Sequence, residues 1–389
     1  MVFWKVKPDP YEEARTGRRS LPIFLTILLA GAIYYGFSEL SYLLYTKIFD
    51  AVQSGITNYK IDSYAPFLND FNIIVRSALF LLIGVLGVLY VRFLEGRKLS
   101  TMGYHKKGLA GGLLGGLGIA VLLMGSMIAV FLFAGSILFE GELDLHFGTV
   151  LLDILALLIL GFSSELYFRG FLLSSLGARC KPLLAVLLTA LVSTVGHSFY
   201  WGWNIFSFYN NLLFDLLLGL LAVRTCNAWL AGAVRSFWLI LCQLVFGILY
   251  SGQACYYKLI PNVVNYENGS WVGASCVDTG NVFTAVMLIG ILLVLLLPKK
   301  DPRDEEEEQK PFFQHVPVEK KTPDAAPAAA PEKMVAEPVL RRPESLKKAP
   351  APAEEPMESP AEEDEENWDE EETRAIVHPE FKNPEQYLK

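Results

Sequence analysis

The sequence predicts an all-α, polytopic membrane helical bundle with about eight transmembrane helices and a disordered, acidic C-terminal tail. Hydrophobic residues make up 52% of the chain, and its mean hydropathy is +0.35. They are gathered in long apolar runs, which is typical of transmembrane helices and does not fit a soluble globular protein. The charge is divided unevenly, because residues 301–389 hold 25 acidic and 12 basic side chains, whereas the whole chain carries -8. The membrane part is therefore mildly basic, and nothing in this balance indicates nucleic-acid binding.

Eight apolar runs follow one another along the chain. They lie at about 21–46, 72–91, 108–139, 148–176, 182–200, 206–223, 228–250 and 281–297. If the N-terminus is cytoplasmic, the basic clusters between the runs all fall on the cytoplasmic side, and the acidic loop at 140–144 falls outside. This agreement with the positive-inside rule predicts that both termini are cytoplasmic. The first run is too long for a cleavable signal peptide and lacks a small-residue cleavage site.

The runs divide the chain into six expected parts. These are a cytoplasmic N-terminal segment at 1–20, two transmembrane helices in 21–91, a membrane core at 92–250, an extracytoplasmic loop at 251–280, a last transmembrane helix at 281–298 and the tail at 299–389. The tail is rich in Pro and Glu and cannot bury enough apolar surface to fold. Its stretch WDEEETRAIVHPEF is either a short docking motif or a solvated segment with a few apolar residues.

The outward loop holds two cysteines, Cys255 and Cys276. Since this side of the membrane is oxidising, we expect a disulfide between them, with two free thiols as the alternative. Asn268 begins an Asn-Gly-Ser glycosylation sequon, which matters only if the cell is eukaryotic. In the third run, Gly111/Gly115 and Gly112/Gly116 form small-xxx-small pairs, which predict close helix packing.

The fourth run contains the most informative stretch, GFSSELYFRGFLLSSL at 161–176. Glu165 and Arg169 lie one helical turn apart in it, so they share a face and can pair. Charges at membrane depth usually face the protein interior and mark a functional site. His197 is the histidine within an apolar helix, and it belongs to the next run. Glu165, Arg169 and His197 are therefore the candidate functional residues. The alternative is a structural ion pair between Glu165 and Arg169 and a structural His197 that is hydrogen-bonded within the bundle.

Several motifs resemble the CPBP family of intramembrane proteases, which includes type II CAAX prenyl endopeptidases, bacteriocin-processing and Abi-like proteins. SELYFRGFLL is similar to the family's first motif, which typically shows Glu-Glu-x-x-x-Arg, often followed by Gly. Three further stretches agree in place or spacing, and the resemblance covers roughly 90–250. They are LEGRKLSTMGY at 94–104, TALVSTVGH at 189–197 and GLLAVRTCNAWLAGAVR at 219–235. The resemblance implies that a motif glutamate and motif histidines prepare a water molecule to cleave a peptide bond within the membrane, by a metal-dependent or a purely glutamate-based mechanism. On this resemblance Glu165, Arg169 and His197 are the candidate catalytic residues.

The chain departs from this pattern at catalytic positions. Ser164 stands where the first motif has its first Glu, and Ser193 replaces the Phe of the second motif. Arg235 stands where the third motif has His, and Leu239 where it has Asn or Asp. A serine hydroxyl is no general base near neutral pH without a partner of its own. An arginine stays protonated, so it neither binds a metal nor accepts a proton.

These replacements favour a non-catalytic relative that binds a membrane partner or a lipidated peptide, with a divergent active endopeptidase as the alternative. A catalytic zinc usually needs three protein ligands, and only Glu165 and His197 are obvious ones. Glu39, Asp153 and Asp215 also lie in apolar runs, and one of them could complete a site. We expect no cofactor, and a divalent metal such as zinc only in an active enzyme. The simpler prediction is that Arg235 neutralises Glu165 or Asp215 in a buried charge network.

The expected partners follow from these predictions. They are the lipid bilayer, a membrane protein or a prenylated peptide, and a cytoplasmic partner of the acidic tail, but no nucleic acid. The expected location is a bacterial inner membrane or, in a eukaryote, the endoplasmic reticulum. A transporter lacks support, because neither a pair of broken helices nor a repeat of two halves is visible. A serine hydrolase using Ser164 or Ser193 with His197 lacks a nucleophile-elbow motif.

Overall fold

The computed structural model describes most of the first 296 residues. The described residues are 14–15, 17, 21–59, 65–141, 143, 145–201, 203–265, 269–273 and 276–296. The acidic tail, most of the N-terminal basic segment, the sequon residue Asn268, and Glu142 and Asp144 of the acidic loop lie outside them.

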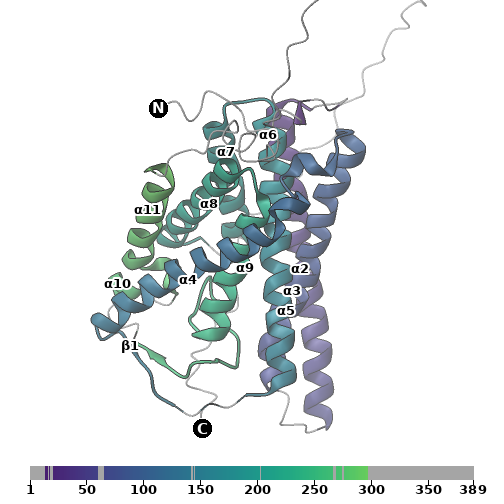
Figure 1. Cartoon of the computed structure of the whole chain (residues 1–389). Coiled ribbons are helices and arrows are strands. Elements are labelled where there is room, and N and C mark those ends of the chain that lie inside the picture. Colours follow the sequence, from purple (N-terminus) through teal and green to yellow (C-terminus); the bar gives the residue numbers. More distant parts are fainter. Residues whose placement is uncertain are drawn as a thin grey trace, which may run out of the picture. The chain divides into compact units, whose positions relative to one another are not determined.

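Almost all of the described part is helical (Figure 1). The long helices are α2 (Ile23–Tyr59), α3 (Ala65–Leu89), α4 (Leu109–Phe133), α5 (Phe147–Glu165), α7 (Pro182–Trp201), α8 (Ile205–Thr225), α9 (Ala228–Leu239) and α11 (Asn281–Leu296). The short ones are α6 (Leu173–Gly177), α10 (Gly269–Val272) and the 3-10 turns η3 (Leu99–Met102), η4 (Lys106–Gly108) and η8 (Val277–Thr279). Among the described residues the sheet consists of two short antiparallel strands, β1 (Ile137–Leu138) and β2 (Val263–Val264), with Ile137 opposite Val264.

The predicted fold class is confirmed, since each of the eight apolar runs forms a helix. Six helical stretches of the described chain are long and apolar enough to cross a membrane. They are Ile23–Val52, Ile73–Leu94, Leu99–Phe133, Phe147–Gly177, Ile205–Thr225 and Ala228–Val245. The fifth and eighth runs form shorter apolar helices, Pro182–Ser198 and Asn281–Leu296. With its 25 residues, α4 alone spans about 37 Å at 1.5 Å per residue, more than the roughly 30 Å of a bilayer's hydrocarbon core.

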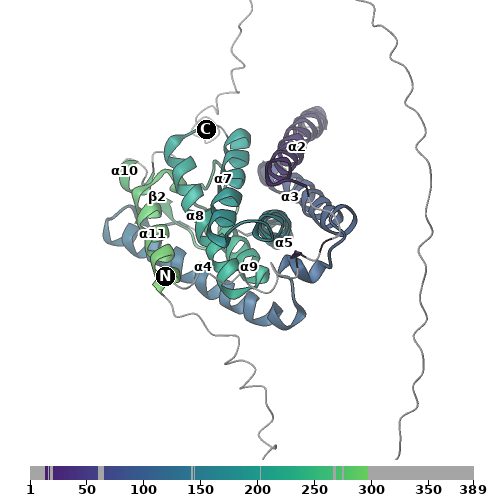
Figure 2. The same ribbon diagram turned by 90° about the horizontal axis from the view of Figure 1, so that it is seen from above.

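Helix α5 lies at the centre of the packing. Figure 2 shows it between α3 and α9, and both helices contact it extensively. The other face of α9 packs on α4, while α8 packs on α7 and α11. Aromatic side chains just beyond the end of α5 are completely buried, namely Tyr167, Phe168 and Phe171. The end of α5 is therefore a dry interior position, and any charge there must find its partners within the protein.

Glycines allow α9 to approach its neighbours closely. A Cβ added at Gly116 of α4 would overlap the Cβ of Ala233, and one at Gly112 would lie 2.7 Å from the Cβ of Trp229. A Cβ at Gly161 of α5 would likewise overlap the Ser236 hydroxyl. The expected tight packing is therefore confirmed for Gly112 and Gly116, whereas a Cβ at Gly111 would meet nothing within 4 Å.

Three of the long helices change into a π-helical turn at their C-terminal ends. These turns are η2 (Tyr90–Leu94) after α3, η5 (Leu166–Leu172) after α5 and η6 (Ile240–Val245) after α9. Short π-helical insertions within α-helices are rare and frequently lie at functional sites. One of them, η5, carries Arg169.

The expected disulfide is wrong, because Cys255 and Cys276 are both free. The two cysteines contact different residues. Cys276 Sγ accepts a hydrogen bond from the amide of Gly252 at 3.2 Å. The backbone amide of Cys255 donates to Gln243 O at 3.0 Å, which ties Cys255 to η6. The alternative of two free thiols therefore holds in this structure.

Candidate functional site

Four ionised side chains from different parts of the bundle meet in one buried cluster. Glu165 ends α5, Arg169 belongs to η5, Asp215 lies in α8 and Arg235 in α9. Their exposed fractions are 0% for Glu165, 2% for Arg169, 1% for Asp215 and 5% for Arg235. We call these four residues the charge cluster.

Glu165 is contacted by both arginines. Arg169 follows Glu165 by one helical turn. Its Nε lies 3.0 Å from Glu165 Oε2, and its Nη1 donates a hydrogen bond to Glu165 Oε1 at 3.0 Å. Arg235 Nε donates to the same Oε1 at 3.3 Å. Each oxygen of this carboxylate therefore faces a guanidinium group.

Asp215 links the same two arginines from the opposite side. Arg169 Nη2 donates to Asp215 Oδ1 at 3.0 Å and to its backbone oxygen at 2.6 Å. Arg235 Nη2 donates to Oδ1 at 2.7 Å. Thr194 of α7 donates its hydroxyl to the other oxygen, Oδ2, at 3.2 Å. The cluster thus joins four helical elements by charge-assisted hydrogen bonds, which are stronger than neutral ones.

The outer side of Arg235 is closed by aromatic and polar groups. Arg235 Nη1 lies 3.5 Å from the Tyr250 hydroxyl, which in turn donates to Asn211 Oδ1 at 2.6 Å. The guanidinium carbon is 4.9 Å from the centre of the Phe214 ring, a cation–π distance. No sequence pattern pointed to Tyr250, because this residue lies beyond α9 and η6, in a loop whose path depends on tertiary packing.

The charge cluster is electrically balanced, since two carboxylates face two guanidinium groups. Taking unbalanced charges out of water is very costly, and a buried pair is tolerated only with good geometry and further hydrogen bonds. The prediction that Arg235 neutralises Glu165 or Asp215 is therefore confirmed, and Arg235 pairs with both of them.

His197 lies beside this cluster on α7 and is half-buried. Its Nδ1 is 2.8 Å from the carbonyl oxygen of Ser193, so Nδ1 carries the proton because a carbonyl can only accept. The ring packs against Tyr34 at a centroid distance of 5.8 Å and Phe168 at 6.2 Å. It follows Thr194, which donates to Asp215, by three residues of α7. The structure therefore brings Glu165 and Arg169 into direct contact, and holds His197 by its own helix and two aromatic rings.

The substituted motif positions have structural explanations. Ser164 donates its hydroxyl to Gly161 O, 2.9 Å away in its own helix. Leu239 is buried among other core side chains. Ser193 accepts a hydrogen bond from the retained His197 at its backbone carbonyl. These hydrogen bonds are the ordinary ones of serine and histidine within helices.

A second buried ion-pair group lies in the segment 94–104. Arg97 Nε donates to Glu95 Oε2 at 2.7 Å, and Arg179 Nη2 donates to Glu95 Oε1 at 2.7 Å. Arg97 Nη2 also donates to Ser175 of α6 at 2.8 Å. Near the end of the segment, Gly103 O accepts the backbone amide of Ala228 at the start of α9. The segment therefore docks on α6 and on the start of α9, and its η3 turn contacts η5, which carries Arg169.

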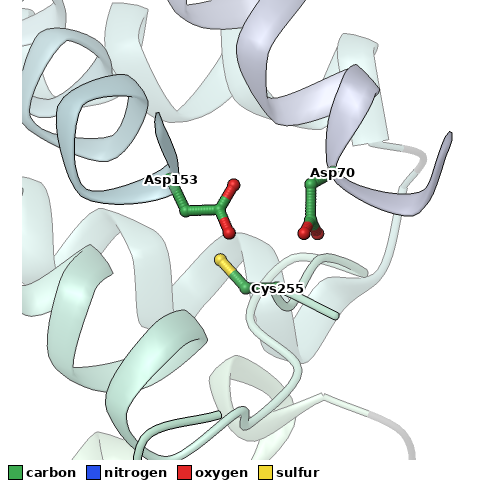
Figure 3. Close-up of side chains that lie close together, drawn as sticks. All are labelled: Asp70, Asp153 and Cys255. Atoms are coloured by element: carbon green, nitrogen blue, oxygen red, sulfur yellow. The ribbon is translucent and has the colours of Figure 1, made fainter. Parts of the chain in front are cut away.

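In the described part of the chain, Glu165 and His197, the two ligands considered for zinc, are not part of a group of three or more side chains close enough to hold one metal ion. Among the described residues, the group of His, Cys, Asp and Glu that could hold a metal ion consists of Asp70, Asp153 and Cys255 (Figure 3). Asp215, one of the acids considered as a third ligand, is occupied by the two arginines, and Glu39 is exposed.

The fold and the charge cluster define a polytopic helical membrane protein with ion pairs buried at the junction of four helical elements. Residues 146–241 match the family model described as Type II CAAX prenyl endopeptidase Rce1-like, which confirms the predicted resemblance over about a quarter of the chain. The matched segment contains the whole charge cluster and His197. No curated protein and no solved structure matches the chain.

Proposed function

We propose that this protein is a non-catalytic relative of the CAAX-processing endopeptidases, which binds a membrane protein segment or a prenylated peptide in the membrane. The observation that carries the proposal is the occupation of Glu165 by two guanidinium groups. A general base must reach the proton that it abstracts, directly or through one water molecule. Both oxygens of Glu165 instead face arginine nitrogens in a dry interior.

Protonation of Glu165 would also upset the charge balance. One carboxylate, that of Asp215, would then face two buried guanidinium groups, and an uncompensated buried charge is strongly destabilising. Ser164 and Arg235 offer no substitute base, for the chemical reasons given above. The cluster therefore suits a structural role within an inherited framework.

A small recess beside Arg169 is the candidate contact point for a bound segment. It lies between the segment 94–104, the end of α8 and the start of α9. Its lining residues are Met102, Gly103, Arg169, Ala222, Cys226, Asn227 and Ala228. Its volume is about 10 Å³, so it has room for one small apolar group at the tip of a bound peptide.

The test is a cleavage assay combined with a binding assay. The full-length protein in detergent is incubated with prenylated CAAX peptides and with a library of membrane peptides, as are Glu165→Ala and His197→Ala. We expect no cleavage above background in any sample. A photoreactive farnesylated peptide should label the wild-type protein, and an excess of unlabelled peptide should compete with it.

A variant in which a large side chain fills the recess tests whether the peptide binds there. Ala222→Trp should abolish labelling, whereas Leu122→Trp should not, because Leu122 is exposed on the outer face of α4. Equal labelling of both variants would contradict a binding site at this recess.

The alternative function, a divergent active endopeptidase, is favoured by the family match and by the retention of Glu165, Arg169 and His197. Peptide cleavage by the wild-type protein that both alanine variants abolish would establish that alternative and overturn the non-catalytic proposal.

A further inference from the structure

Two carboxylates and a thiol converge at a second place, away from the charge cluster. Figure 3 shows Asp70 of α3, Asp153 of α5 and Cys255 of the loop after η6 pointing toward one space. One ligand atom from each lies within 4.8 Å of the other two. Exposed fractions are 0% for Asp70 and Asp153 and 6% for Cys255.

Asp153 is the observation that points to a bound cation. Both of its carboxylate oxygens are buried and lack a hydrogen-bond donor among the described residues, because the neighbour within hydrogen-bond reach, Asp70, is itself a carboxyl group. No lysine or arginine of the described chain forms an ion pair with Asp153. Buried polar atoms are nearly always satisfied, and each exception requires an explanation such as an ion.

The protein holds the other two groups in position independently of any ion. Asp70 Oδ1 accepts the backbone amide of Tyr256 at 2.8 Å, which fixes this carboxylate against the loop. The loop is in turn tied to η6 through the backbone amides of Cys255, Leu259 and Ile260, which donate to Gln243, Leu244 and Val245. Three separate elements therefore present their side chains from a rigid scaffold.

We propose that Asp70, Asp153 and Cys255 form a zinc site. Zinc accepts cysteine sulfur together with Asp oxygen, and a site with three protein ligands leaves its fourth position for water. Calcium and magnesium prefer oxygen ligands alone, so the sulfur selects against them.

The zinc site is separate from the charge cluster. Asp153 precedes Glu165 by 12 residues on α5, which corresponds to about 18 Å along a helix. An ion here would link α3, α5 and the loop. The proposal of a zinc site does not depend on the proposed function.

The test uses the full-length protein in detergent, after exposure to zinc and removal of the excess. We expect about one zinc per chain by elemental analysis, a Tm that falls on addition of a chelator, and recovery of the Tm with zinc. Cobalt(II) in place of zinc should give the near-ultraviolet charge-transfer band of a thiolate ligand.

Variants separate this site from accidental binding. Cys255→Ser should remove the cobalt band, and Asp153→Asn should lower the zinc content. Cys276→Ser is the matched control, because this thiol lies in the same loop outside the group, and its metal content should stay unchanged.

Folded wild-type protein that holds no zinc and shows no cobalt–thiolate band would overturn the proposal, even if a variant failed to fold. Zinc retained in full by both Cys255→Ser and Asp153→Asn would also overturn it. A metal-free protein that Asp153→Asn stabilises would show instead that the two carboxyl groups share a proton.

Discussion

At the scale of single residues, Arg235 is the group on which the charge balance of the membrane core depends. It contacts Glu165, Asp215 and Tyr250, and it replaces a histidine of the resembled motif. The exchange of histidine for arginine removes a proton acceptor and adds a permanent positive charge. That charge is needed because, without Arg235, the single positive charge of Arg169 would face the two negative charges of Glu165 and Asp215.

Arg235→Met should therefore be strongly destabilising. Loss of one partner from a buried charge group typically costs about 3–5 kcal/mol in soluble proteins. Equilibrium unfolding in mixed detergent micelles measures the change. Arg92→Met is the control, since Arg92 is exposed, and its effect should stay within about 0.5 kcal/mol. Similar small losses for both variants would show that the cluster contributes little to stability.

His197→Phe tests whether this histidine has only a structural role. Phenylalanine can keep the ring contacts with Tyr34 and Phe168, while the hydrogen bond to Ser193 O is lost. A net hydrogen bond contributes about 0.5–1.5 kcal/mol, so we expect a loss of that size in the same unfolding measurement. Labelling by the farnesylated peptide should persist, and its disappearance in a folded variant would assign His197 to the binding site.

Residue chemistry explains how much of this site could be predicted. The pairing of Glu165 with Arg169 follows from their spacing within one helix, and the neutralising role of Arg235 follows from its permanent charge in an apolar run. The contribution of Tyr250 and the convergence of Asp70 with Cys255 join positions far apart in the chain. No local periodicity carries such information.

At the scale of helices, the contact between α4 and α9 depends on the face that each glycine occupies. Gly116 faces Ala233, whereas Gly111 faces open space. Gly116→Ala should destabilise the protein by about 1–3 kcal/mol, as overpacking does. Gly111→Ala should stabilise it by up to about 1 kcal/mol, because alanine favours a helix over glycine. Thermal unfolding in detergent measures whether each substitution raises or lowers the stability. Destabilisation by both substitutions would contradict this packing.

The helices themselves were predictable because long apolar runs leave the backbone in lipid no other way to satisfy its hydrogen bonds. The π-helical turns η2, η5 and η6 were not predicted, since the added residue in such a turn responds to neighbouring helices. The expected disulfide failed for a related reason. A shared loop brings Cys255 and Cys276 to the same region, but the burial of each thiol decides its partner.

At the scale of the whole molecule, the expected orientation in the membrane remains a prediction. The exposed residues Lys106 and Glu140 flank α4 at its two ends. With both termini cytoplasmic, a membrane-impermeant maleimide should label Glu140→Cys in intact cells and Lys106→Cys only after permeabilisation. The reverse result would invert the predicted topology.

The native thiol at Cys276 gives a pH-dependent readout in the loop. Burial and the nearby Asp278 raise the pKa of Cys276 to about 11. Since the thiolate is the reactive form, its labelling rate should be low at pH 7 and rise about tenfold per pH unit toward pH 11. The folded state favours the thiol, so stability from this group is complete below the unfolded pKa and is lost as the pH rises through about 11. A plateau reached near pH 8.5, measured by mass spectrometry, would contradict this burial.

Asp215 and Arg235 lie on α8 and α9, which are joined by only Cys226 and Asn227. This arrangement has a consequence for biosynthesis. One charge at the centre of a helix costs about 2.5–3.5 kcal/mol for insertion by the translocon. Glu165 and Arg169 neutralise each other within a single span, but α8 and α9 each bring one unmatched charge to the cluster. We therefore expect α8 to remain at the translocon until α9 has been synthesised, and the two to enter the lipid together as a hairpin.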